Sequence, residues 1–167
     1  MLSNVQKELN VFGKYVVSQS RANLTRQKKN ASKNLWNSIK YEVEVGKNSF
    51  ALSFLMEEYG EYQDKGVSGV KKKYNTPFSY KDKMPPRQKL DKWIVRKGIA
   101  PRDKSGRFIS RRSLQYLIAR SIFTNGIKPS LFFTKPFKKA FKNLDANLIE
   151  AFKLDVEELM ANSINNK

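Results

Sequence analysis

The sequence predicts an α+β fold, with a long N-terminal helix and several further helices packed on a small antiparallel sheet. Apolar residues recur every three or four positions near both ends of the chain, which is typical of amphipathic helices. Two short runs between them alternate apolar and polar residues around a turn, which predicts a β-hairpin at about residues 38–56. At 167 residues we expect one domain (1–167) that carries a basic, loop-rich insertion at 71–108.

The first predicted element is a helix with one apolar face. Val5, Leu9, Phe12 and Val16 recur at helical spacing, and a stripe of this kind more often faces a core than a partner.

The predicted hairpin consists of two alternating runs, Ile39–Val45 and Phe50–Met56, on either side of a turn signal at 46–49. Side chains alternate between the two faces of a strand, so one face should be apolar and the other should carry Glu42 and Glu44.

The rest of the chain is predicted to be helical, with exposed loops. After a loop at 71–86, Pro86 suits the first turn of a helix that ends at Gly98. Ser110 is a predicted N-cap, and Gly126 a predicted stop, of a helix whose inner face includes Leu114 and Leu117.

Two further helices are predicted near the C-terminus. Pro136 can begin a short helix with Phe137 and Phe141 inward, and Asp145 can cap a separate last helix.

An acidic corner follows the hairpin, and it could contain catalytic acids, a metal site or a helix start. Its carboxylates are Glu57, Glu58, Glu61 and Asp64. Acidic residues in a first turn complement the helix dipole, and the spacing matches no metal-binding motif. We therefore interpret the corner as a helix start, with Tyr59 and Tyr62 directed toward the hairpin, and expect no catalytic residue, cofactor or metal.

Charge is the strongest signal for function. The net charge is +18, and residues 71–142 carry 21 basic and 3 acidic side chains, whereas residues 143–167 carry 2 basic and 5 acidic ones. Such a balance favours a polyanionic partner, and the acidic end also permits head-to-tail complementarity between copies. The chain has no cysteine and no histidine, which excludes imidazole-based catalysis and Cys/His zinc sites.

The basic middle predicts a surface that contacts DNA, another polyanion or a neighbouring subunit. Its candidate residues are Lys71, Lys72, Lys73, Arg87, Lys89, Arg96, Lys97, Arg102, Lys104, Arg107, Arg111 and Arg112. No motif for sequence-specific recognition is present, so phosphate contacts without base readout are expected. A metal-dependent nuclease built on Glu42 and Glu44 is a weaker alternative. No apolar run is long enough to span a membrane, and the start lacks signal-peptide features, so we expect no membrane partner.

Three segments in this order resemble the head–tail joining, or tail-completion, family of tailed bacteriophages, also described as minor virion morphogenesis proteins. They are "SKNLWNSIKYEVEV" (32–45), "FLMEEYGEYQDKGVSG" (54–69) and "LIARSIFTNGIKPSLFFTKPFKKAF" (117–141). The second is similar to Y-x-x-Y-x-D-x-G and the third to I-A-x-x-I-x-x-x-G-I-K-P-x-x-F-F. The basic insertion at 71–108 is longer than in the usual family pattern.

The resemblance implies a non-enzymatic structural subunit of the virion neck, assembled in the host cytoplasm. Such a subunit would form a ring with copies of itself, with six- or twelve-fold symmetry, and contact portal or adaptor proteins, tail proteins and packaged DNA. The candidate ring-interface residues are Tyr59, Tyr62, Asp64, Phe132 and Phe133. For Phe132, Phe133 and Phe137 a core role is the preferred alternative. A non-specific, nucleoid-like DNA-binding protein is the alternative function.

Overall fold

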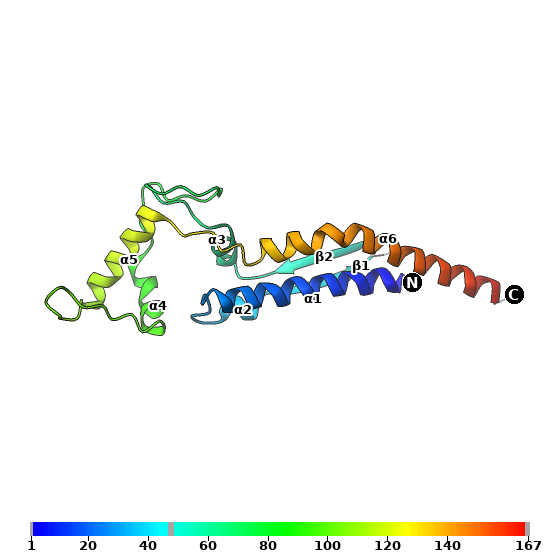
Figure 1. The fold of residues 1–167 in the computed structure, drawn as a ribbon, viewed down its shortest axis with the longest axis horizontal. Coiled ribbons are helices and arrows are strands. Elements are labelled where there is room, and N and C mark those ends of the chain that lie inside the picture. The colour runs from blue at the N-terminus through cyan, green and yellow to red at the C-terminus, as the bar shows by residue number, and fades with distance from the viewer. Residues whose placement is uncertain (1, 47–48, 166–167) are drawn as a thin grey trace. The chain divides into compact units, whose positions relative to one another are not determined.

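The computed structural model describes residues 2–46 and 49–165, and the side chains up to residue 162 (Figure 1). The described elements are α1 (Ser3–Arg26), α2 (Asn34–Ser38), β1 (Lys40–Val45), β2 (Phe50–Leu55), α3 (Tyr59–Lys65), the 3-10 turn η1 (Arg87–Leu90), α4 (Asp91–Arg96), α5 (Arg111–Asn125) and α6 (Thr134–Asn165). This confirms the predicted α+β class, with a long N-terminal helix and an antiparallel hairpin.

The chain forms two compact units. The first unit comprises residues 1–26, 36–57 and 132–167, and the second comprises 27–35 and 58–131. The predicted insertion at 71–108 lies within the second unit, and the single domain stays a prediction.

In the first unit, α1 and α6 lie side by side and the hairpin packs on them (Figure 1). The predicted stripe of α1 is confirmed, because Val5, Leu9, Phe12 and Val16 are all buried. Burial of this continuous apolar face supplies the main driving force for the helix pair.

The hairpin register places its apolar residues opposite one another. Tyr41 pairs with Phe54, and Val43 with Leu52, on the half-buried face. The predicted turn at 46–49 lies partly outside the described residues, although the Gly46 amide donates to the carbonyl oxygen of Ser49 at 2.8 Å.

The core of the first unit is aromatic. The Phe54 ring packs edge-to-face on Phe12, Phe133 and Phe137, with centroids 5.3–6.1 Å apart. Phe132 is fully buried, and its carbonyl accepts a 3.0 Å hydrogen bond from the Asn23 side chain. The core interpretation of these phenylalanines is therefore confirmed.

The prediction of two C-terminal helices is wrong, because α6 runs unbroken from Thr134 to Asn165. Pro136 is in the first turn, where its missing N–H costs no helical hydrogen bond. Asp145 is exposed inside the helix, while Leu144 and Ala151 are buried in the contact with α1. One long helix buries both of these side chains, so tertiary packing overrides the local capping signal.

Asp155 of α6 caps the N-terminus of α1 from 150 residues away in the sequence. Its carboxylate accepts hydrogen bonds from the backbone amides of Asn4 (2.9 Å) and Val5 (3.0 Å) and from the Asn4 side-chain amide (3.0 Å). Desolvation alone would raise the pKa of Asp155, but these bonds and one from the Ser3 hydroxyl lower it below its ordinary value. The contact satisfies amides that a helix start leaves unpaired and complements its dipole.

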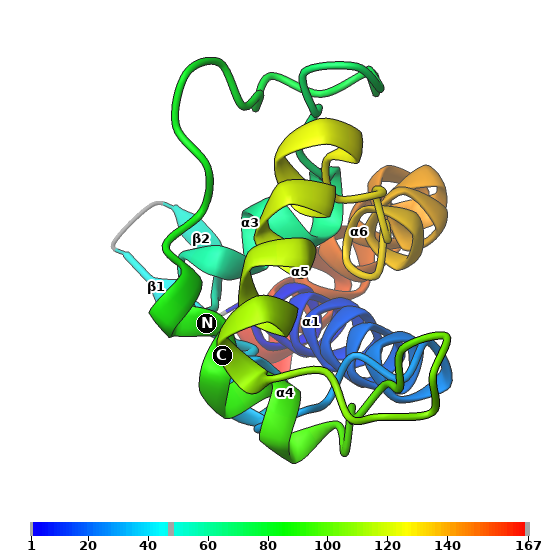
Figure 2. The same cartoon turned by 90° about the vertical axis from the view of Figure 1, so that its left-hand side faces the viewer.

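In the second unit, α5 lies beside η1 and α4, and a long loop joins α3 to η1 (Figure 2). The predicted ends of α5 are confirmed: the Ser110 hydroxyl accepts from the Ser113 amide at 3.2 Å, and Gly126 terminates the helix with φ 72°. Its inner face differs from the prediction, since Leu114 and Ala119 are buried whereas Leu117 is exposed.

Candidate interaction surfaces

Two of the segments that carry the family resemblance meet in the second unit. Val67 and Ile127 exchange backbone hydrogen bonds of 2.8 and 2.9 Å in an antiparallel bridge. The amides of Ser130 and Leu131 donate to the carbonyl of Asp64 at 3.1 and 3.0 Å, at the end of α3. The second and third segments, some sixty residues apart in the sequence, thus form one backbone junction.

Glycines allow this close approach. Gly66 has φ 75°, and a Cβ there would lie 2.6 Å from the carbonyl oxygen of Ile127. Gly126 has φ 72° and ψ −166°, and a Cβ there would overlap the carbonyl oxygen of Val67. Only glycine readily adopts such a backbone conformation, and only glycine lacks the colliding atom.

The loop after the junction is tied down by Ser68. Its hydroxyl accepts from the Tyr74 amide (2.9 Å) and donates to the Tyr74 carbonyl (3.1 Å). Its backbone bonds Phe78 and Tyr80 at 2.8 and 2.9 Å. The aperiodic sequence at 71–86 predicts a loop but does not reveal this tether, which fixes the two aromatic side chains beside α3.

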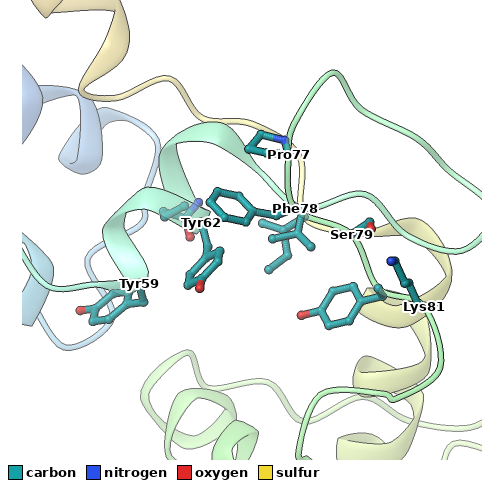
Figure 3. A pocket seen from close by; sticks show the side chains of 10 residues that line it. Tyr59, Tyr62, Pro77, Phe78, Ser79 and Lys81 are labelled. Atoms are coloured by element: carbon teal, nitrogen blue, oxygen red, sulfur yellow. The ribbon is translucent and has the colours of Figure 1, made fainter.

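A pocket of about 690 Å³ lies between α3 and this loop (Figure 3). Its lining residues are Tyr59, Tyr62, Gln63, Val67, Pro77, Phe78, Ser79, Tyr80, Lys81 and Ile127. Tyr62 packs edge-to-face on Phe78 with centroids 4.5 Å apart. Tyr59 and Tyr62 thus line a pocket of their own unit, and their orientation toward the hairpin stays a prediction.

The pocket also contains polar groups, which could form hydrogen bonds of defined direction. Nε2 of Gln63 is buried and has no hydrogen-bond partner among the described residues. Burial also raises the pKa of the Tyr80 phenol. The sequence gives no signal that Gln63 lines a pocket, because the other wall is formed by residues 77–81, which are distant from it in the chain.

The candidate ring-interface residues differ in exposure. Tyr59 and Tyr62 are exposed, whereas Asp64 and Phe132 are buried and Phe133 is half-buried. The exposed part of this set is therefore the tyrosine edge of the pocket.

The acidic corner is a helix start in the structure. Glu57, Glu58 and Glu61 are exposed, Glu58 directly precedes α3, and Glu61 forms an ion pair with Lys65 at 2.6 Å. Within residues 2–46 and 49–165, no three carboxylates group together as metal ligands would. Glu42 and Glu44 lie on the exposed face of the hairpin, and Glu42 pairs with Lys40 at 2.7 Å.

All twelve candidate basic residues are exposed and lie in the second unit. That unit carries 21 basic and 6 acidic side chains, a balance of +15, whereas the first unit carries 12 and 9. Several cations lie over aromatic rings: Arg102 is 3.9 Å from the centroid of Phe108, and Arg87 is 5.8 Å from that of Tyr116. Structure thus separates the chain into a nearly neutral unit and a strongly basic one.

No helix within the described part of the chain is long and apolar enough to cross a membrane. No protein-family model matches the sequence, and no curated protein or solved structure matches it either.

Proposed function

We propose that this chain is a structural subunit of the neck of a tailed-bacteriophage virion. It would belong to a ring that joins the portal or head to the tail and lets DNA pass. The observation that carries the proposal is the backbone junction at Val67 and Ile127, where two of the three resembling segments meet. Two segments that bond to each other in the fold are expected to occur in the same chain. The junction is therefore a physical reason why the second and third segments appear together in this sequence.

The charge of the second unit fits this role. A channel for DNA needs positive or mixed charge without tight binding, since tight phosphate contacts would slow ejection. Exposed lysines and arginines, among them Lys71–Lys73, supply positive charge of this kind. The same unit could instead face portal, adaptor or tail proteins of the neck.

A second candidate function, non-specific DNA binding in a nucleoid-like role, is favoured by the same balance of +15. It predicts affinity for any duplex, with a steep dependence on salt and no need for a ring.

Light scattering and electron microscopy of the purified protein test the two functions. We expect a discrete ring, six- or twelve-fold, either alone or after addition of portal–adaptor particles of the same virus. A monomer that ignores those particles and coats short duplex DNA would contradict the neck role and favour the second function. Labelled antibodies should also mark the neck of intact virions.

A further inference from the structure

The C-terminal half of α6 has a second apolar face besides the one that packs on α1. Ile149, Phe152, Val156 and Met160 recur at spacings of three and four residues, which places them on one side of the helix. Ile149 is 72% exposed and Met160 is 64% exposed. A stripe of this kind on a surface helix is a typical anchor for a groove in a partner.

Negative charge accompanies this face. Glu150 and Glu157 lie along its edge, and residues 145–162 contain five acidic side chains and one basic one. Because Asp155 accepts hydrogen bonds from the start of α1, the other acidic side chains of residues 145–162 provide the exposed negative charge. The partner groove should therefore be apolar inside and positive at its rim.

The second unit contains a groove with these properties. A pocket of about 350 Å³ between α4, α5 and the loop at 98–109 has an apolar lining that includes Ile94, Val95, Ile99, Phe108, Ile109 and Leu114. Val95 is 56% exposed and Phe108 is 63% exposed.

The rim of this groove is basic. Arg111 lines it, and Arg102 lies over the Phe108 ring at 3.9 Å. The surrounding segment, residues 87–112, contains ten basic and two acidic side chains. Its charge is opposite in sign to that of residues 145–162 of α6, and both surfaces expose large apolar side chains.

We propose that the Ile149–Met160 face of α6 docks in the Val95–Phe108 groove of a second copy of this chain. The contact joins two different surfaces, so it is heterologous, and each copy offers both halves. Contacts between like surfaces are disfavoured, because α6 against α6 brings acidic side chains together and groove against groove brings basic ones together. The inference rests on the proposed ring, for which it names the contact that repeats around it.

Cysteine cross-linking tests this contact directly, because the chain has no cysteine of its own. One chain carries Lys153→Cys, beside the α6 face, and a second chain of distinguishable mass carries Ala100→Cys, in the groove lining. Each chain has one thiol, so no disulfide can form within a chain. We expect the mixed disulfide at least tenfold above that of a matched mixture in which Ala51→Cys, on the exposed face of β2, replaces Lys153→Cys.

Charge reversal supplies a second readout. Glu150→Arg with Glu157→Arg should abolish cross-linking, and mixing with a groove chain that carries Arg102→Glu and Arg111→Glu at the rim should restore it. Circular dichroism confirms that each exposed substitution leaves the helices intact.

Cross-linking no better than the Ala51→Cys control overturns the inference, whether or not rings form. Closed rings without the cross-link would leave the neck proposal intact. The cross-link without closed rings would keep the contact and contradict the ring.

Discussion

Replacing Gly126 by alanine tests the backbone junction that brings two of the resembling segments together. The alanine Cβ would overlap the carbonyl oxygen of Val67 and lie 2.5 Å from the amide nitrogen of Gly69. Both atoms belong to the backbone, so the collision cannot be relieved by rotating a side chain. The substitution should force the Val67–Ile127 bridge apart and disturb the tyrosine-lined pocket.

Two costs add at this position. The backbone conformation of Gly126 (φ 72°, ψ −166°) costs a residue with a Cβ about 1–3 kcal/mol. Overpacking against a fixed backbone costs about 1–3 kcal/mol more. We therefore expect the free energy of unfolding of the second unit to fall by about 4 kcal/mol.

Gly98→Ala is the matched control. Gly98 also has a positive φ, 61°, but nothing lies within 4 Å of its Cβ position. The Gly98→Ala variant should therefore lose only about 1–2 kcal/mol of unfolding free energy, which is the cost of the backbone conformation alone. The difference between the two variants isolates the collision at the junction.

Tryptophan fluorescence in urea separates the two units, because Trp36 belongs to the first and Trp93 to the second. In a Trp36→Phe background, the midpoint for Gly126→Ala should fall about 2–3 M below that of Gly98→Ala, for a slope of about 1 kcal/mol per M. In a Trp93→Phe background, the fluorescence of Trp36 reports the first unit, and its unfolding midpoint should be the same with and without Gly126→Ala. Equal losses for the two alanine variants would refute the close approach at the junction.

Three other predictions follow from named contacts. Phe12→Ala should lower the stability of the first unit by about 3–5 kcal/mol, read from Trp36 fluorescence, because the ring is buried among other aromatic rings. The pKa of Asp155 is lowered from its ordinary value of 3.8, so its contribution is present above that value and is lost as pH falls through the folded-state pKa. Thermal unfolding should show Asp155→Asn less stable than the native chain at pH 7, with the gap closing in strong acid; a gap independent of pH would contradict the cap. If Lys71–Lys73 contact phosphates, replacing all three by alanine should reduce the slope of log K against log salt by about 2.7 in duplex binding, whereas an unchanged slope would place DNA elsewhere.

Much of this protein follows from local sequence signals. Helical spacing locates α1 and its buried face, alternation locates the hairpin, and Ser110 and Gly126 mark both ends of α5. These features depend on neighbours within a few positions, so a single sequence is enough to predict them. The concentration of positive charge in the middle of the chain is likewise a property of composition.

Tertiary structure decided what depends on distant residues. The predicted break at Asp145 is absent because packing on α1 favours one continuous helix, and Asp155 becomes a cap only because α6 reaches the start of α1. Asp64 is a candidate interface residue in the sequence, yet the fold buries it. The pocket around Gln63 exists because Ser68 ties down a loop whose sequence shows no period. Such contacts join residues that are far apart in the chain. Their energies depend on burial and on three-dimensional geometry, which local sequence patterns do not predict.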